Sequence, residues 1–401
     1  MTAIHSRILG HRGRRPLLAA VFQHFPPYPG GGAIRAHAFA KALGCEIHDQ
    51  APFVVITTVS APDVGAGDTF TVQSTGGGAV GSGHGLGVRA VSEVGSGILA
   101  VFKLLYYRPH FVVISTPGYL FAMVVVAFLR IFRVPYMLDV RDIYPEAYAE
   151  AGLVRRGSWA YRVFVAISRF MYTGAKSVIA VTEGLSAHIR AQAPSANVDV
   201  VYNGYPRTFR GIRAEKHARF TVCFHGVMGF YQDVESLVAL ARALERSDVN
   251  VVVIGFGRKA SIFSDNPPSN LKFLGQLSFD RTISEVSRAH VGLCLRTDDD
   301  ISKDAVPVKL FEYIGLGLPS LVTPPSEGGR LVQRLGCGSV FDAGDVEGLV
   351  AAILELKDEP KLYAQMASAC RASGEEFTRE FQAQVFSGIV SRIIHADKHD
   401  S

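Results

Sequence analysis

Short apolar runs alternate with segments of helical spacing along most of the first half of the chain. The runs have the length and the β-branched content of buried strands, and the segments between them repeat their apolar residues every three or four positions. Such alternation predicts an α/β fold, a parallel sheet with helices on both faces. The expected strands are LLAAVF (17–22), FVVIT (53–57), FVVIS (111–115), VPYML (134–138), SVIAV (177–181) and VDVVY (198–202), and the expected helices include 33–43, 158–172 and 183–191.

The alternation restarts after residues 204–219, a polar segment without an apolar period. We therefore expect one domain at 1–205, a second α/β domain at 206–372 and a C-terminal helix at 373–401. The second series has expected strands at 220–226, 249–257, 270–275, 291–295 and 320–323, with helices at 234–244, 281–289 and 346–356.

Residues 61–97 interrupt the pattern of the first domain. They are rich in glycine, as in STGGGAVGSGHGLG (74–87), and contain a single strand-like piece, TFTV (69–72). We expect a mobile loop or an insertion here, and no nucleotide-binding fingerprint.

Length and composition set the broad class. The chain of 401 residues is long enough for two or three domains, and 48% apolar with 19% charged residues is an ordinary globular balance. A formal net charge of +5 is too small to indicate a nucleic-acid partner, and we expect none. The five cysteines are widely spaced without a CxxC, which indicates neither a zinc site nor a disulfide framework. We therefore expect a reducing, cytoplasmic compartment and no signal peptide.

Two features bear on membranes. Basic residues cluster at 11–15 and 155–156, either as solvated arms or as contacts with an anionic membrane surface. The most apolar stretch, YLFAMVVVAFL (119–129), has 11 residues and is followed by Arg130 and Arg133. A spanning helix needs about 20 residues, so we expect a buried or interface-lying helix. Any membrane contact would be peripheral, at the inner face of the cytoplasmic membrane.

A glycine run follows the first expected strand. FPPYPGGGAIRAHAFAKAL (25–43) places Gly31 and Gly32 just before a helix, where backbone amides and the helix N-terminus can meet an anion. Arg35 could add a bidentate phosphate contact. The alternative is a flexible turn.

A charged cluster follows the strand VPYML. LDVRDIYPEAY (138–148) places Asp139, Arg141, Asp142 and Glu146 where strand ends point toward the ligand crevice of a parallel sheet. The alternative is a surface cluster of salt bridges.

An acidic run, Asp298, Asp299 and Asp300, could hold a divalent ion that bridges a diphosphate. It lies between an expected strand and an expected helix, so we interpret it as a solvated loop and expect no metal. The histidines at 24, 37, 110, 225 and 290 show no metal-ligand spacing, and we expect most of them to be structural.

The segment PVKLFEYIGLGLPSLVT (307–323) places a cation and a carboxylate three residues apart near the start of a short helix. Lys309 and Glu312 would share one face of that helix, and a helix that only fills a core needs neither charge. Gly315, Gly317 and Pro319 predict a sharp break before an apolar strand. We expect both charges to serve a nearby site.

Together and in this order, these segments resemble the retaining glycosyltransferases of family four, and specifically their bacterial surface-polysaccharide branch. The similarity covers nearly the whole chain. The segment 25–43 resembles the first loop and helix of the family, VPYMLDVRDIYPE (134–146) its acceptor-side strand, FHGVMGFYQDVESLVAL (224–240) the opening of its donor domain, and 307–323 its donor motif. The resemblance implies the GT-B fold, in which two Rossmann-like domains face a central cleft and the C-terminal helix crosses back to the first domain.

The resemblance also implies residue roles on the donor side. Glu312 would hydrogen-bond the nucleotide ribose, while backbone amides near Gly315 would meet the diphosphate. Asp304, eight residues before Glu312, corresponds to the first of the paired carboxylates of the family. Lys309 would balance the charge that grows on the departing diphosphate. The other donor-binding residues that we expect are Gly31, Gly32, Arg35, Gly226 and Arg296.

One departure from the family lies on the donor side. After the first strand of the donor domain, the family usually has an arginine and, a few residues later, a lysine toward the diphosphate. Phe230 and Gln232 stand near those places here. Either Lys309, Arg296 or Lys303 substitutes for them, or donor binding is altered.

A second departure lies on the acceptor side. Many relatives have His-Asp where this chain has VRD (140–142), so Arg141 and Asp142 take that place. The catalytic residues that we expect are Arg141, Asp142 and Glu312.

The resemblance implies a hexosyltransferase that moves a sugar from a nucleotide-sugar donor to a glycan or lipid-linked acceptor, with retention and without a metal or other cofactor. Two alternatives stay open. One is a nucleotide-sugar 2-epimerase, which also uses two Rossmann-like domains. The other is a catalytically weakened donor-binding subunit of a polysaccharide complex, suggested by Phe230 and Gln232.

Overall fold

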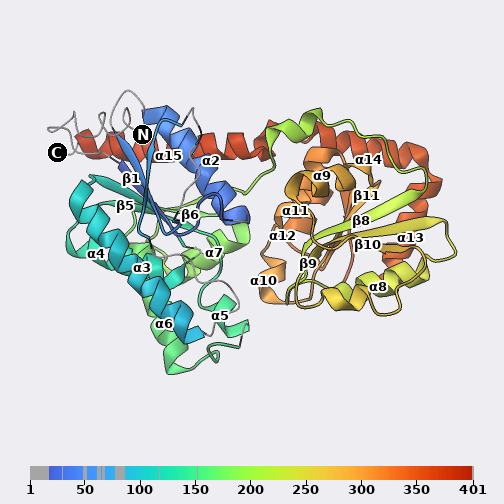
Figure 1. The fold of residues 1–401 in the computed structure, drawn as a ribbon, viewed down its shortest axis with the longest axis horizontal. Helices are drawn as coiled ribbons and strands as arrows, with labels where there is room; N and C mark the ends of the chain where they lie inside the picture. The colour runs from blue at the N-terminus through green and yellow to red at the C-terminus, as the bar shows by residue number, and fades with distance from the viewer. Residues whose placement is uncertain are drawn as a thin grey trace. The chain divides into compact units, whose positions relative to one another are not determined.

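The computed structural model describes residues 18–28, 30–47, 52–60, 65, 68–76, 86–116, 118–150 and 152–399 (Figure 1). The chain forms two compact units. The first contains residues 1–181, 185–201 and 383–401, and the second contains 182–184 and 202–382. The basic cluster at 11–15 lies outside the described residues.

The first unit is built on a seven-stranded parallel sheet with the order β3-β2-β1-β4-β5-β6-β7. At its centre, Ala20 of β1 pairs with Val55 of β2 and Val113 of β4. Every run predicted as a strand in this half lies in this sheet. The strands are β1 (Leu18–Phe22), β2 (Phe53–Thr57), β3 (Thr71–Ser74), β4 (Phe111–Ser115), β5 (Tyr136–Val140), β6 (Ser177–Ala180) and β7 (Val198–Val200).

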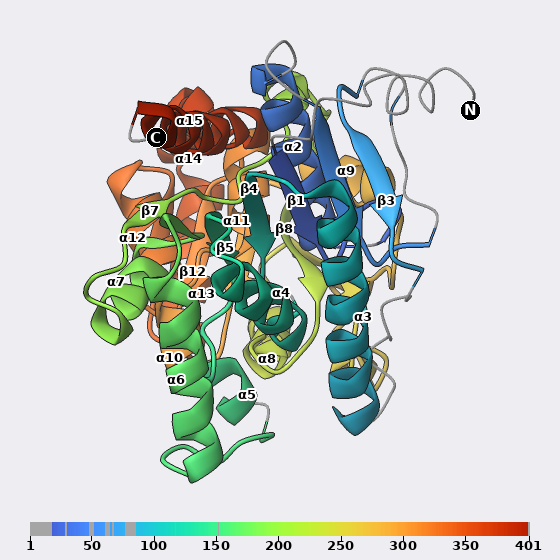
Figure 2. The ribbon, with the colours of Figure 1, turned by 90° about the vertical axis from the view of Figure 1, so that its left-hand side faces the viewer.

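Alternate side chains along these strands enter two apolar cores, one on each face of the sheet. Helices α3, α4, α6 and α7 cover one face, and α2 and α15 cover the other. Figure 2 shows α4 between α3 and α6. The helices are α2 (Gly31–Ile47), α3 (Leu86–Tyr107), α4 (Tyr119–Ile131), α5 (Glu146–Glu150), α6 (Trp159–Thr173), α7 (Glu183–Gln192) and α15 (Arg379–His399).

Helix α15 belongs to both units. Its first residues, 379–382, are part of the second unit, and from Ala383 onward it is part of the first. There Phe386 stacks on Phe39 of α2, with ring centroids 3.8 Å apart. The chain therefore returns to its first domain at the C-terminus, as predicted, and buries Ala383, Ile389, Val390 and Ile394 in that core.

The prediction of one glycine-rich loop over 61–97 is wrong. Within this range the structure has strand β3 and the first half of α3, a helix of 22 residues. Gly97 lies where a Cβ would come within 3.1 Å of the carbonyl oxygen of Phe121, so its glycine permits the close packing of α3 on α4. Tertiary packing thus holds a helix in which glycine lowers the intrinsic propensity.

Helix α4 contains the apolar stretch 119–129, and this stretch is part of the core. The buried positions on α4 are Tyr119, Phe121, Ala122, Val125, Val126 and Leu129. Among the residues that the structure describes, no helix has both the length and the apolar character needed to cross a bilayer.

The second unit has a six-stranded parallel sheet with the order β10-β9-β8-β11-β12-β13. Helices α9, α11 and α12 cover one face, and α8 and α13 the other. The strands are β8 (Phe220–Val227), β9 (Val249–Phe256), β10 (Leu271–Phe273), β11 (Val291–Leu295), β12 (Ser320–Thr323) and β13 (Gly338–Val340). The helices are α8 (Val234–Ala243), α9 (Phe279–Arg288), α10 (Asp300–Lys303), α11 (Val308–Leu316), α12 (Glu327–Arg334), α13 (Val346–Asp358) and α14 (Pro360–Ala372), with 3₁₀ turns η1 (Arg207–Gly211), η2 (Ala260–Phe263) and η3 (Glu375–Phe377).

Side-chain caps fix where several helices begin. A serine or aspartate oxygen accepts a hydrogen bond from the backbone amide three residues later, which satisfies a donor that the helix cannot use. The capping residues are Ser158, Asp233, Ser278 and Ser326. Ser158, Asp233 and Ser278 cap helices that were predicted to within a few residues, whereas the helix that Ser326 caps was not predicted.

Candidate active site

Both sheets reverse their strand order beside their first strand, between β1 and β4 in one unit and between β8 and β11 in the other. Ligands of open parallel sheets bind outside the carboxyl ends of the strands at such a point. In the second unit, His225 and Gly226 lie near the end of β8, and Arg296 follows β11. In the first unit, α2 follows β1 and Arg141 follows β5.

Helix α11 is fixed on the second sheet by Tyr313. The Tyr313 hydroxyl lies 3.2 Å from the carbonyl oxygens of Cys223 in β8 and Leu293 in β11, and it donates to them. Gly292 of β11 has no Cβ, which would overlap the Tyr313 ring. This packing holds Lys309 and Glu312, on the preceding turn, at the end of β8.

The predicted break at Gly315 is wrong. Helix α11 continues through Gly315 and ends at Leu316, and Gly317 forms the left-handed C-cap with φ 73°. A Cβ at Gly315 would overlap the ring of Tyr205, so close packing explains this glycine. Gly315 also lies at the opposite end of α11 from Lys309, so the structure does not bring it to the charged end of the helix.

Lys309 is buried although it carries a charge. Its Nζ donates to Oε1 of Gln232 over 2.9 Å and lies 3.7 Å from the centroid of the Phe224 ring. A Cβ at Gly226 would lie 3.5 Å from the same Nζ, so Gly226 borders the ammonium. Gln232 stands near the place where the resemblance leads us to expect a lysine. The ammonium of Lys309 therefore lies beside Gln232, near the position of the family's lysine, and it comes from α11.

Glu312 lies one turn after Lys309 and is 7% exposed. Its Oε2 is 3.4 Å from Nε2 of His225, and that nitrogen makes no hydrogen bond with any residue that the structure describes. The His225 ring packs edge-on against Tyr313, with centroids 5.2 Å apart. A carboxyl group and an imidazole with unused hydrogen-bonding capacity thus lie side by side.

Burial shifts the ionisation of all three groups. Burial raises the pKa of Glu312 to about 7, and the charges of Arg379 and Lys309 oppose the rise. Burial lowers the pKa of Lys309 to about 8. Burial, with a contribution from Lys309, lowers the pKa of His225 to about 3. Near neutral pH the cluster therefore holds an ammonium, a neutral imidazole and a carboxyl group close to half ionisation.

Arg296 lies on the other side of the strand-order reversal. Its Nε donates to Oγ of Ser302 over 3.1 Å, and its guanidinium carbon lies 5.5 Å from the centroid of the Tyr231 ring. Gln232 and Arg296 also form an isolated antiparallel bridge. The structure thus places Arg296 beside the loop that carries Gln232.

The interpretation of the acidic run as a loop is wrong for Asp300, while Asp298 and Asp299 precede the helix. Asp300 begins α10, and Asp299 caps this helix by accepting from the backbone N of Ser302 over 2.8 Å. Asp298 is exposed and pairs with Lys303 at 2.9 Å. In the part of the chain that the structure describes, no three histidine, cysteine, aspartate or glutamate side chains form a group that could hold a metal ion.

Asp304 follows α10 as its C-cap. A Cβ at Gly184 would overlap the Asp304 side chain, so this carboxylate lies against the main chain of 182–184, a segment of the second unit. The structure gives no hydrogen bond between Asp304 and either Lys309 or Glu312, all three of which lie in its described part.

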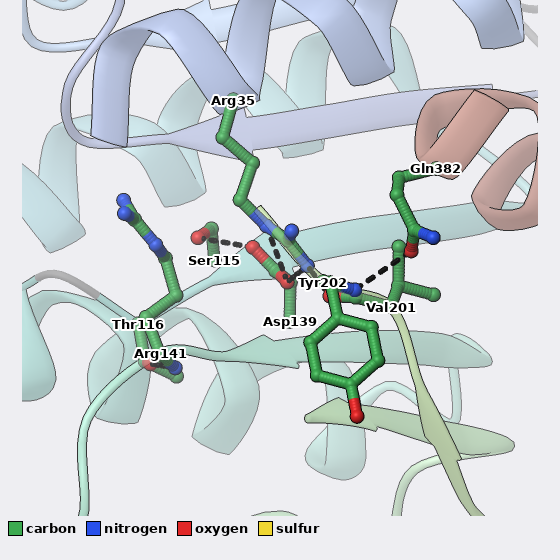
Figure 3. Close-up of polar contacts among 8 residues, drawn as sticks. All are labelled: Arg35, Ser115, Thr116, Asp139, Arg141, Val201, Tyr202 and Gln382. Atoms are coloured by element: carbon green, nitrogen blue, oxygen red, sulfur yellow. Dashed lines mark hydrogen bonds and ion pairs between the residues drawn. The ribbon is translucent and has the colours of Figure 1, made fainter. Parts of the chain in front are cut away.

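In the first unit, the guanidinium of Arg35 bonds within the protein. It is buried, and its Nη2 donates to Oδ1 of Asp139 and to the carbonyl of Val201, both over 2.9 Å (Figure 3). Ser115 donates to the other carboxylate oxygen of Asp139 over 2.8 Å. The side chain thus ties α2 to the ends of β5 and β7, and the expected donor contact of Arg35 stays a prediction.

Arg141 points away from this buried pair (Figure 3). Its backbone N–H donates to Oγ1 of Thr116 over 3.2 Å, while its buried Nε makes no hydrogen bond within the described residues. Its Nη1 lies where a Cβ of Gly32 would be, at the second residue of α2. A guanidinium beside a helix N-terminus places two positive potentials together, an arrangement that suits an anion. Gly31 begins this helix, and Asp142 is exposed beside Arg141.

Two residues that lie near Lys309 and Glu312, or act on them, were not predicted as site residues. They are His225 and Arg379. His225 was assigned a structural role, although its place just before Gly226 at a strand end was a usable signal. Arg379 acts on Glu312 through its charge from the start of α15. No local pattern marks Arg379, because only the fold brings it near α11.

Comparison with known protein families gives the class of this protein. Residues 30–204 match the family described as glycosyl transferase 4-like domain, and residues 207–373 match glycosyl transferases group 1. Both halves of the chain belong to glycosyltransferase families, and the protein is a glycosyltransferase.

Solved structures of similar proteins define the fold. The sucrose-phosphate synthase of Thermosynechococcus elongatus superposes with a TM-score of 0.73 at 13% identity, covering 96% of this chain and 100% of that chain. HepE of Anabaena in complex with UDP-glucose gives 0.67 at 16% identity, covering 93% and 99%. The fold is therefore GT-B, which confirms the predicted fold class.

One relative is similar over part of its length. A GDP-mannose-dependent monoacylated alpha-(1-6)-phosphatidylinositol monomannoside mannosyltransferase of Corynebacterium glutamicum is 26% identical over 151 residues. The match covers 36% of this chain and 39% of that relative.

Proposed function

We propose that this glycosyltransferase is a hexosyltransferase that takes its sugar from a nucleotide-sugar and passes it, with retention of configuration, to a glycan or lipid-linked acceptor in bacterial surface-polysaccharide synthesis. The observation that carries the proposal is the buried Lys309–Glu312 pair at the carboxyl end of β8. Two similar proteins support the donor class, since one is a GDP-mannose-dependent mannosyltransferase and the other was solved in complex with UDP-glucose.

On the donor side, we assign a separate role to each of five residues of the second unit. They are Glu312, His225, Lys309, Arg296 and Asp304. The Glu312 carboxylate accepts hydrogen bonds from the ribose hydroxyls, and His225 borders the same place. The Lys309 ammonium, which Gly226 borders, neutralises the diphosphate as the bond to the sugar breaks. Arg296 adds positive charge from the end of β11. Asp304 occupies the sequence position of the first of the paired carboxylates of the family.

In the first unit, Gly31 and Gly32 at the α2 N-terminus bind an anionic group of the donor, and Arg141 lies beside them. Asp142 is exposed beside Arg141 and positions the acceptor hydroxyl. The configuration at the sugar C1 is retained if the acceptor hydroxyl attacks C1 from the same face that the diphosphate leaves. The new bond forms between the sugar C1 and the acceptor oxygen, the bond from C1 to the phosphate oxygen breaks, and the hydroxyl proton passes to the departing diphosphate.

A nucleotide panel tests this proposal. We expect one of UDP, GDP, ADP and TDP to raise the melting temperature, since a hundredfold excess over Kd stabilises the folded protein by about 2.7 kcal/mol.

Glu312→Gln should raise the Kd for that nucleotide by about 10- to 150-fold, because a hydrogen bond to a charged acceptor contributes about 1.5–3 kcal/mol. Wild-type affinity should rise as pH passes 7, where Glu312 ionises, and fall above pH 8, where Lys309 loses its proton.

The rise in affinity near pH 7 should be absent in Glu312→Gln, which has no carboxyl group to ionise. Asp298→Asn, at an exposed carboxylate, serves as the matched control and should bind nucleotide as the wild type does. Nucleotide binding by Glu312→Gln at wild-type affinity would contradict the ribose assignment. Conversion of the sugar in a nucleotide-sugar without any acceptor would instead indicate an epimerase, and binding without transfer or donor hydrolysis would indicate a weakened donor-binding subunit.

Transfer should not require a divalent metal. Cationic side chains, Lys309 above all, supply the charge that a metal would bring to the diphosphate in this mechanism. We expect EDTA to leave the initial rate within about twofold of its value without chelator, since little of the charge stabilisation depends on an ion. A rate abolished by EDTA and restored by Mn²⁺ or Mg²⁺ would show that a metal carries the leaving group.

A further inference from the structure

Helix α3 exposes a continuous apolar face. Val91, Phe102 and Tyr106 are 74%, 63% and 73% exposed, values more usual for charged side chains. They recur at helical spacing with Val88, Ile98, Leu99 and Leu105, which are also exposed. The opposite side of α3, with Ala100 and Leu104, packs in the first-unit core. The helix is therefore apolar on both sides, and only one side is covered by the residues that the structure describes.

Helix α6 repeats this arrangement in the same layer. Trp159 is 78% exposed, and Val163 and Phe170 follow on the same face at intervals of four and seven residues. Its other side buries Met171 and Tyr172. Helices α3 and α6 flank α4 on one face of the sheet (Figure 2), and both exposed stripes lie outside the core that these helices form with the sheet.

The charges of this layer are nearly all positive. Helices α3, α4 and α6 carry five cations and one acid. The acid, Glu93, accepts a hydrogen bond from the backbone N of Leu120 over 3.1 Å, so it is engaged within the layer. The cations are Arg89, Lys103, Arg130, Arg162 and Arg169.

We propose that the outward faces of α3 and α6 form a docking surface for an anionic lipid bilayer. Apolar side chains among cations suit the interface of such a bilayer, where the rings enter the boundary region and the cations meet the headgroups. Two copies joined face to face on a two-fold axis would bring like charges together, which disfavours a second chain as the occupant. The surface differs from the one expected from the sequence, since α4 is in the core and α3 was not expected.

The proposal does not depend on the proposed transfer reaction, because binding is measured without substrates. Full-length protein would be floated with vesicles of phosphatidylcholine alone or with phosphatidylglycerol added. We expect flotation only with the anionic lipid, and release at high salt as the Debye length falls from about 10 to 3 Å. Val91→Ser/Phe102→Ser should lower the partition coefficient by at least about tenfold. Arg89→Gln/Lys103→Gln should lower it by about 25-fold, since each cation near the surface contributes about fivefold.

Phe279→Ser is the matched control, because Phe279 is an exposed aromatic residue of α9 in the second unit and should not affect flotation. Trp159 is the single tryptophan of the chain, so its emission reports on α6 directly. We expect a blue shift with anionic vesicles and quenching by lipids brominated near the headgroup. Wild-type flotation of the Val91→Ser/Phe102→Ser variant, or an unshifted Trp159 in floated protein, would overturn the proposal. Loss of a dimer in that variant, without flotation of the wild type, would assign the face to a second copy instead.

Discussion

Lys309→Met should lower the rate of sugar transfer by about 100- to 1000-fold, the usual effect of removing one group that stabilises charge in the transition state. The ammonium is held by Gln232 at 2.9 Å and is bordered by Gly226. Methionine has a similar length and fills the same buried space, so the melting temperature should change little. The rate would be measured with saturating donor, and the nucleotide panel would report the loss in diphosphate affinity.

Two controls separate charge from packing at this position. Lys303→Met removes an exposed lysine that pairs with Asp298, and it should retain the wild-type rate. Lys309→Met/Gln232→Lys returns an ammonium to the same place from the other side of the contact, and should recover at least about tenfold of the lost rate. If Lys309→Met keeps the wild-type rate, the positive charge at this place has no part in transfer. No recovery in the double variant would show that the position of Lys309 on α11, and not charge alone, is required.

Asp139→Ala should destabilise the first unit by about 3–5 kcal/mol, because it leaves the buried Arg35 guanidinium without its counter-charge. Both side chains are buried, and Ser115 loses its acceptor in the same variant. Denaturant unfolding followed by far-UV circular dichroism measures this loss as a lower midpoint than that of the wild type.

The double variant Arg35→Met/Asp139→Leu removes both charges and should recover most of that stability, because replacing a buried pair with apolar groups is often close to neutral. Arg89→Met, at an exposed arginine of the same unit, is the matched control and should stay within about 0.5 kcal/mol of the wild type. The folded double variant should bind the preferred nucleotide as the wild type does. If the double variant is stable but no longer binds nucleotide, Arg35 contacts the donor.

The sequence by itself determined the two series of strands and helices. Buried parallel strands are continuous apolar runs, and helix starts carry their own caps, so both signals are local and need no knowledge of the fold. The order of FPPYPGGG, VRDIYPE and PVKLFEYI further indicated a glycosyltransferase and led us to expect that Lys309 and Glu312 serve the donor site.

Only the tertiary structure decided which charged side chains bond to other residues of the protein, and to which ones. Arg35 and Asp139 are 104 residues apart, and Lys309 and Gln232 are 77 apart, so no spacing rule predicts either pair. The same holds for Gly315, which is explained by the ring of Tyr205, and for α3, whose glycines argue against a helix until α4 packs on it. The physical reason is shared by all of these cases. Burial changes what a charge costs and what a glycine permits, and burial is a property of the packed chain, not of the local sequence.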